Sequence, residues 1–309
     1  MSINVEKILV TGASGFVGSA VAAKLIDDYQ LISVVRKGAS KEKIPGQVMS
    51  INGLENDVDF SEALADIDVV IHIAAKAHNT SVEESEYYKV NVEGTLNLAR
   101  QAARCGVKRF IFLSSIGVNG SENQKPFSEA DEPQPSELYA ESKWRAEQGL
   151  WDISEQYNLD VVIIRPPLVY GPNAPGNFGR LVRLAQKGIP LPLGNIKNQR
   201  SFIALDNLVD LIATCVEHPD ASNQLFVAGD GCDVSTTDLL LGLSRAMGKS
   251  LYLIPLPANL LMFFMSAVGK EKMARQLLGS LRVDISKARS LLGWEPPVSF
   301  EEGLKRCFK

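Results

Sequence analysis

The sequence predicts an α/β protein built on a doubly wound parallel sheet, with a smaller α/β region toward the C-terminus. Short apolar runs alternate with segments of helical periodicity, an order typical of strands joined by crossover helices. The runs are continuously apolar, which indicates strands covered by helices on both faces. The expected strands are 8–10, 31–35, 69–73, 110–113 and 161–164, and the expected helices are 16–28, 84–104 and 139–157.

The first expected strand leads directly into a glycine-rich turn. Residues 8–18 read ILVTGASGFVG and are followed by a helical pattern. Such a turn directs backbone N–H groups and the positive end of a helix dipole toward a pyrophosphate. We therefore expect a Rossmann-type dinucleotide site, in which Gly12 makes the tight turn, Gly15 lets the phosphates approach and Gly18 permits close helix–strand packing. The alternative is a glycine-rich turn that binds no ligand.

The end of the second expected strand carries two basic residues, Arg36 and Lys37. In dinucleotide-binding folds this point faces the adenosine ribose, where an acidic residue accepts bonds from the 2′-hydroxyl and an arginine accommodates a 2′-phosphate. The pair therefore favours NADP(H), and NAD(H) is the alternative cofactor. Two solvated basic residues in a loop would produce the same pattern.

A tyrosine and a lysine at 139 and 143 are spaced to share one face of the helix 139–157. Ser115 follows the strand 110–113 and can approach this pair from the side, with Ser114 as the neighbouring alternative. Reduction of a carbonyl needs a proton donor beside the oxygen, and a phenol can serve at neutral pH when a nearby cation stabilises its phenolate. Tyr139, Lys143 and Ser115 are therefore the candidate catalytic residues. An exposed Tyr/Lys pair on a helix surface is the simpler alternative.

Composition narrows the class of protein. The 309 residues are 45% hydrophobic and 22% charged, with a formal net charge of −4 and no long basic run, which argues against a nucleic-acid partner. The four cysteines form no C-x-x-C pair, and with only three histidines we expect no metal site. This cysteine usage fits the reduced cytoplasm, and the N-terminal residues show no export signal.

The expected domain organisation changes after residue 165. We assign residues 1–165 to the dinucleotide-binding domain, with 199–218 returning to pack on it. Proline and glycine punctuate the chain beyond Pro166, and we assign 166–198 and 219–309 to the substrate domain. Residues 251–269 are markedly apolar but are interrupted by prolines and are too short for a stable membrane span. We expect a buried helix there, and a surface that leans on a membrane is the alternative.

Together these motifs resemble the extended short-chain dehydrogenase/reductases, the group of nucleotide-sugar epimerases, dehydratases and reductases. The likeness covers essentially the whole chain. The segments that carry it are 11–18, 70–75, 91–95, 112–115, 139–143, 165–172, 200–206 and 284–294.

The resemblance implies a role for each motif. Tyr139 would be the acid/base, Lys143 would lower its pKa and bind the nicotinamide ribose, and Ser115 would orient the substrate oxygen. Asn177 and Arg200 stand where relatives hold the nucleotide diphosphate, which suits the two-donor geometry of a guanidinium. The expected cofactor-binding residues are Gly12, Ser14, Gly15, Phe16, Val17, Gly18, Arg36, Lys37, Ala74, Ala75, Asn91, Tyr139, Lys143 and Pro166.

Three departures from the UDP-galactose 4-epimerase pattern bear on the reaction. Arg36 replaces an acidic residue after the second strand, Gly53 replaces an aspartate after the third, and Asn119-Gly120 replaces Tyr-Gly near the sugar. Ile116-Gly117 replaces the Asp-Glu pair that dehydratases carry, which disfavours dehydration.

The nearest likeness is to UDP-N-acetylquinovosamine-type 4-ketoreductases of polysaccharide biosynthesis. We therefore favour reduction of a UDP-4-keto-6-deoxy-N-acetylhexosamine, with 4-epimerisation of a UDP-sugar as the alternative. A lipid-linked sugar substrate is a minor variant, and a non-catalytic dinucleotide sensor is a remote one. By resemblance we also expect a homodimer that pairs the helices 84–104 and 139–157.

Overall fold

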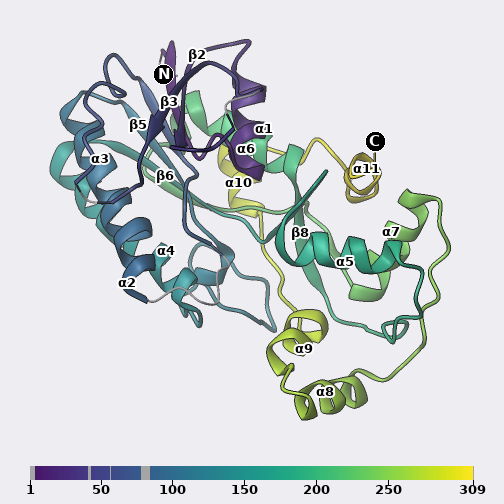
Figure 1. Ribbon diagram of the computed structural model, residues 1–309. Helices are drawn as coiled ribbons and strands as arrows, with labels where there is room; N and C mark the ends of the chain where they lie inside the picture. The colour runs from purple at the N-terminus through teal and green to yellow at the C-terminus, as the bar shows by residue number, and fades with distance from the viewer. Residues whose placement is uncertain (1–3, 41–42, 56, 78–83, 309) are drawn as a thin grey trace.

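A computed structural model describes residues 4–40, 43–55, 57–77 and 84–308 of the chain (Figure 1). Its centre is a seven-stranded sheet of order β3-β2-β1-β4-β5-β6-β9, in which every neighbouring pair is parallel. The predicted doubly wound sheet is therefore confirmed. The strands are β1 (Lys7–Thr11), β2 (Gln30–Arg36), β3 (Gln47–Ile51), β4 (Val69–His72), β5 (Arg109–Leu113), β6 (Asp160–Arg165) and β9 (Gln224–Val227).

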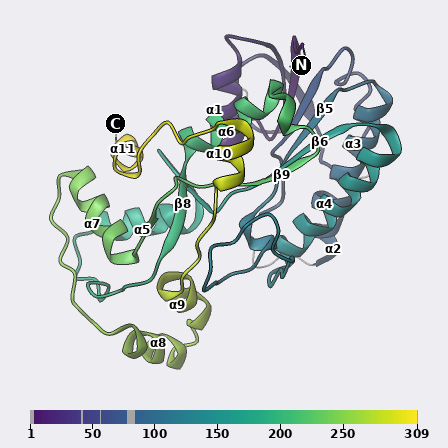
Figure 2. The same ribbon diagram turned by 180° about the vertical axis from the view of Figure 1, so that it is seen from behind.

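Helices cover both faces of this sheet, as Figure 2 shows from behind. On one face lie α1 (Phe16–Leu25), α6 (Leu205–Glu217) and α10 (Ser286–Leu292), and on the other lie α3 (Gly94–Arg104) and α4 (Leu138–Tyr157). Successive strand residues point to opposite faces. Ile8 and Val10 accordingly pack in the first core and Leu9 in the second, all fully buried. Burial on both faces explains the continuously apolar strands.

Several elements differ from the prediction. Helix α1 ends at Leu25, before residue 28, and the expected helix 84–104 is divided into α2 (Glu84–Tyr87), a π-helical turn (Tyr88–Glu93) and α3. Sequence reasoning missed β3, whose exposed edge position allows polar residues, and β9. The range 219–309 was assigned to the substrate domain, but its β9 pairs with β6 and buries Phe226 and Val227 in the large sheet.

The remaining chain forms a smaller α/β region. Its three-stranded sheet has the order β10-β8-β7 and consists of β7 (Leu168–Tyr170), β8 (Arg200–Ala204) and β10 (Asp233–Val234). Around it lie α5 (Gly176–Gln186), α7 (Thr236–Met247) and α11 (Phe300–Arg306). The range 199–218 is thus divided: β8 joins the small sheet, whereas α6 packs beside α1 in the first core.

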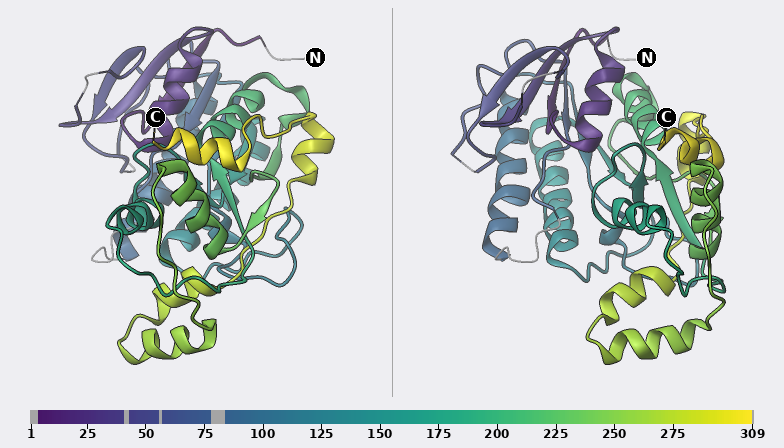
Figure 3. Two further views of the ribbon diagram at one scale, coloured as in Figure 1. Left: turned by 90° about the vertical axis from the view of Figure 1, so that its right-hand side faces the viewer. Right: turned by 45° about the vertical axis from the view of Figure 1, so that its right-hand side comes forward.

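Two further helices, α8 (Ala258–Ala267) and α9 (Glu271–Leu278), form a hairpin that extends away from both sheets (Figure 3). The expected buried helix in this segment is wrong. Of the α8 residues only Leu261 is buried, while Phe263 and Phe264 are exposed, because the hairpin contacts the domain along one side. In the described part of the chain, no helix is both long and apolar enough to cross a membrane.

Candidate active site

The predicted site residues lie together at one edge of the large sheet. Residues 12–18 follow β1, Arg36 and Lys37 end or follow β2, residues 74 and 75 follow β4, Ser115 follows β5 and Pro166 follows β6. The five strands are neighbours and parallel, so their carboxyl ends share one edge. In open α/β sheets this edge is where ligands bind. The topology therefore assembles residues that the sequence separates by up to 154 positions.

Close backbone contacts require glycine at two positions of the turn after β1. Gly12 has a φ of 72°, and a Cβ on it would lie 2.8 Å from the backbone nitrogen of Ala74. A Cβ on Gly18 would collide with the carbonyl oxygen of Gly12. Gly15 caps α1 without a side-chain hydrogen bond, and with Ser14 it is exposed. The turn therefore presents the N-terminus of α1, with its unpaired N–H groups, to the edge of the sheet.

The end of β2 carries exposed cations beside one acidic group. Arg36 and Lys37 are both exposed. The carboxylate of Glu55 occupies the space that a side chain on Gly53 would fill. Sequence reasoning counted Gly53 as the loss of an acid and missed that Glu55, two residues later, returns a carboxylate to this place. The signal was available as an acidic residue in the same loop.

Asn91 lies in the π-helical turn and joins three segments. Its Oδ1 accepts a bond from the backbone nitrogen of Lys76 at 2.8 Å, and its Nδ2 donates to the Lys76 carbonyl at 3.0 Å. The same Nδ2 donates to Ser142 Oγ at 3.0 Å. The wider π turn brings this amide between the loop after β4 and α4, and π turns often mark functional sites. Asn91 thus ties the cofactor edge to the helix that carries Tyr139.

Tyr139 and Lys143 stand on one face of α4. Lys143 is 1% exposed, donates from Nζ to the Leu113 carbonyl at 2.8 Å and lies 4.3 Å from the centre of the Phe112 ring. Burial lowers the pKa of Lys143 to about 7, and the Glu147 carboxylate opposes this shift. Burial also raises the pKa of Tyr139 to about 12, aided by Tyr87. The phenol is therefore protonated at neutral pH, the form that donates a proton.

The two adjacent serines have different surroundings. The Ser114 hydroxyl is buried and donates to Glu147, which also forms an ion pair with Arg165. Ser115 is half-buried, and its Oγ accepts from the Gly117 nitrogen at 3.1 Å. The Ser114 side chain therefore binds other residues in the protein interior. Ser115 is the candidate for contact with a substrate oxygen.

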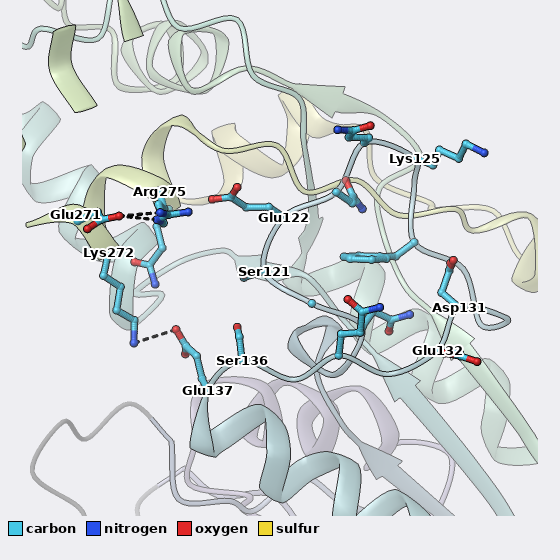
Figure 4. Close-up of a pocket in the computed structure, with 17 residues that line it drawn as sticks. Ser121, Glu122, Lys125, Asp131, Glu132, Ser136, Glu137, Glu271, Lys272 and Arg275 are labelled. Atoms are coloured by element: carbon cyan, nitrogen blue, oxygen red, sulfur yellow. Dashed lines mark hydrogen bonds and ion pairs between the residues drawn. The ribbon is translucent and has the colours of Figure 1, made fainter. Parts of the chain in front are cut away.

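A cleft of about 850 Å³ lies between the loop 119–137 and α9 (Figure 4). Its loop residues follow Ser115 and precede Tyr139 in the chain. Lys272 and Glu137 form an ion pair of 2.9 Å between α9 and the residue that precedes α4, close to Tyr139. Carboxylates, amides and hydroxyls provide many donors and acceptors, as a polyhydroxylated ligand requires. The labelled acidic and basic residues are Glu122, Asp131, Glu132, Glu137, Glu271, Lys125, Lys272 and Arg275.

The two expected diphosphate ligands both contact the C-terminal end of α9. Asn177 donates from Nδ2 to Gln276 at 3.1 Å, and Gln276 lines the cleft. Arg200 donates from Nη1 to the Gly279 carbonyl at 2.9 Å. Burial lowers the pKa of Arg200, and Glu122 opposes this shift. The structure therefore connects both residues to α9 but not to each other.

A Rossmann sheet, a glycine-rich turn and a Ser/Tyr/Lys constellation at one sheet edge define an extended short-chain dehydrogenase/reductase. Within that class, residues 8–229 match the NAD dependent epimerase/dehydratase family, and the chain belongs to this family. It is an enzyme that acts on nucleotide sugars.

Individual relatives match nearly the whole chain. The chain is 42% identical over 310 residues to a UDP-glucose 4-epimerase of Vibrio cholerae, covering 97% of this chain and 94% of the relative. It is 26% identical to an undecaprenol-diphosphate-linked N-acetylglucosamine 4-epimerase of Escherichia coli O157:H7, covering 98% and 95%. The crystal structure of a UDP-glucose 4-epimerase from Thermotoga maritima with UDP-glucose has a TM-score of 0.79 at 28% identity and covers 97% of both chains.

Proposed function

We propose that this enzyme is an NADP(H)-dependent oxidoreductase acting at C4 of a UDP-linked sugar, and that it reduces a UDP-4-keto-6-deoxy-N-acetylhexosamine. The observation that carries the cofactor preference is the exposed pair Arg36 and Lys37 at the end of β2. A guanidinium there can donate two bonds to a 2′-phosphate, whereas a 2′-hydroxyl gains little from it.

The residues of the chain support one proton transfer. A dinucleotide held by the glycine turn and Asn91 would supply hydride to C4. The Tyr139 phenol donates its proton to the C4 oxygen, so that the carbonyl becomes a hydroxyl. The Lys143 ammonium stabilises the phenolate that remains, and the Ser115 hydroxyl holds the substrate oxygen. The protonated state of Tyr139 fits its role as the acid in this direction.

A 4-epimerase is the second candidate, because the Vibrio cholerae relative carries that name. Tyr139 would then first accept the proton of the C4 hydroxyl while an oxidised dinucleotide took hydride from C4. After the ketone had turned its other face, Tyr139 would return the proton to the oxygen and the dinucleotide would return the hydride to C4, so that the cofactor would be recycled. The Escherichia coli relative is named for a lipid-linked sugar. A lipid-linked sugar is therefore a further candidate substrate for either reaction.

The test follows NADPH and NADH absorbance with purified protein and a UDP-4-keto-6-deoxy-N-acetylhexosamine. We expect repeated turnover, much faster with NADPH. No oxidation beyond one equivalent per subunit would overturn the reductase proposal and support the recycled cofactor of an epimerase.

Two variants sharpen this test. Arg36→Asp should lower kcat/KM for NADPH by about 10- to 100-fold and leave NADH less affected. Tyr139→Phe should lower kcat by orders of magnitude while dinucleotide affinity is retained. Full output from Tyr139→Phe would instead indicate the non-catalytic sensor.

We also propose a homodimer in the cytoplasm that pairs the helices 84–104 and 139–157. Gly149 of α4 packs against the Leu96 side chain of α3, so the two helices form one continuous outer layer. Sedimentation at several concentrations tests the dimer.

A further inference from the structure

The α8–α9 hairpin and the strand-like segment before it expose an unusual amount of apolar surface. Residues 250–269 contain no Asp, Glu, Lys or Arg. Among the described residues, seven of the twelve exposed large hydrophobic side chains lie in 252–273: Tyr252, Ile254, Leu260, Phe263, Phe264, Val268 and Met273. Such a concentration marks an interaction surface rather than scattered exposure.

The exposed side chains of α8 share one face. Leu260, Phe263 and Phe264 are 43%, 67% and 55% exposed, and their spacing of three and four residues places them along one side of the helix. Leu261 and Met265 occupy the other side and pack in the core beneath the hairpin. The outer face therefore contributes nothing to the packing of its own domain.

Positive charges bracket this apolar face. Lys249 precedes the uncharged segment and Lys270 follows it, and both are exposed. On α9, Lys272 is paired with Glu137 at 2.9 Å and Arg275 with Glu271 at 2.7 Å, so Lys249 and Lys270 supply the positive charge of the flank. The flank is net positive on a chain whose formal net charge is −4. This distribution complements a negatively charged surface.

The shape of the hairpin favours a lipid surface over a protein as its partner. All views show it projecting from the body of the molecule (Figures 1 and 3). A stable protein interface uses roughly 20 to 30 residues on each side, whereas seven large apolar side chains are exposed on this tip. A projecting apolar tip flanked by lysines can instead insert among acyl chains while its cations meet lipid headgroups.

We propose that the α8–α9 hairpin docks the enzyme on the surface of a membrane that contains anionic phospholipid. The apolar face, here defined as Leu260, Phe263, Phe264 and Val268, enters the headgroup boundary. Helix α9 also lines, through Lys272 and Gln276, the cleft that Glu137 borders two residues before Tyr139. Docking would therefore hold the cleft near the membrane surface. The proposal stands whichever C4 reaction the enzyme performs.

The test is sedimentation of the full chain, saturated with its dinucleotide, with vesicles of two compositions. One contains phosphatidylcholine alone, and the other contains phosphatidylcholine and phosphatidylglycerol in equal parts. We expect the chain to pellet with the second and to remain in solution with the first. The double variant Phe263→Ser/Phe264→Ser should bind the anionic vesicles at least about tenfold more weakly, since two phenyl rings lose their burial.

Two control variants separate the apolar and electrostatic contributions. Ile26→Ser removes an exposed apolar side chain at the end of α1 and should bind like the wild type. Lys249→Glu/Lys270→Glu should lose the preference for phosphatidylglycerol. Thermal unfolding and dinucleotide binding check that each variant folds.

Three results would overturn the proposal. The wild type could stay in solution with both vesicles, or the double phenylalanine variant could bind as the wild type does. Self-association without vesicles that the same variant abolishes would assign the face to a second copy of the chain.

Discussion

Glu147 and Arg165 form a buried ion pair beneath the candidate active site, with Arg165 Nε donating to Glu147 Oε1 at 3.0 Å. The same carboxylate accepts from Ser114, and Arg165 also donates to Asn119 at 2.9 Å. Glu147 thus binds the segment after β5 to α4 and β6. Its charge also favours the protonated form of Lys143, one helical turn away.

Replacement of this carboxylate should be costly. We expect Glu147→Gln to lower the free energy of unfolding by about 3 kcal/mol, because it leaves the buried guanidinium of Arg165 without its counter-charge. Urea denaturation measures the change. Glu141→Gln is the matched control, since Glu141 pairs with Arg145 on the exposed side of the same helix and should lose less than about 0.5 kcal/mol. Equal losses in the two variants would contradict this account.

The two adjacent serines should separate activity from stability. Ser115→Ala should lower kcat by about 100-fold with little change in unfolding, because it removes a donor to the substrate oxygen. Ser114→Ala should lower the free energy of unfolding by about 1 to 2 kcal/mol, because it removes a buried bond to Glu147. Steady-state kinetics and denaturation on both variants decide the assignment. The reverse pattern would make Ser114 the catalytic serine.

The turn after β1 should tolerate no side chain at Gly12. Gly12→Ala should lower the free energy of unfolding by at least about 2 kcal/mol and weaken dinucleotide binding, because the new methyl group meets the backbone of Ala74 at a positive φ. Gly248→Ala has a similar φ of 63° but open space around it, so it should lose only about 1 kcal/mol. Calorimetry measures both effects. Similar losses would show that strain in φ, not contact with Ala74, constrains Gly12.

His72 should make the protein sensitive to acid. Its ring lies between the Thr11 and Thr95 hydroxyls at 2.7 and 2.9 Å, and burial, aided by the charge of Lys143, lowers its pKa to about 3. The ordinary pKa of histidine is 6.5, so between about pH 3 and pH 6.5 this side chain is protonated in the unfolded chain and neutral in the folded one. Stability is therefore complete above pH 6.5 and falls by roughly 4 kcal/mol as the pH approaches 3.

Denaturation of His72→Gln across this range provides the measurement. Glutamine does not titrate, so this variant should lose most of the dependence on pH. His218→Gln changes a half-buried ring that caps a short helical turn and should retain the wild-type slope. An unchanged slope in His72→Gln would assign the acid sensitivity to other groups.

Strong local signals predicted the sheet and most of the site. The apolar strands could be predicted from their continuous apolar runs because burial on both faces leaves few polar positions in them. The glycine turn and the spacing of Tyr139 and Lys143 are equally local, since a tight turn and one helix face involve few residues. The edge strand β3 and the strand β9 escaped prediction, because their short runs depend on partners that are distant in the chain.

The sequence by itself determined the doubly wound sheet, the glycine turn and the shared helix face of Tyr139 and Lys143, because periodicity and spacing encode them locally. Only the tertiary structure shows that Ser114 turns inward to Glu147 while Ser115 stays half-buried, since adjacent residues after a strand differ in direction, and direction depends on what packs beside them. It also decided that one face of α8 is exposed. An apolar segment has the same sequence pattern whether or not other residues cover it, so its exposure depends on how the rest of the chain packs.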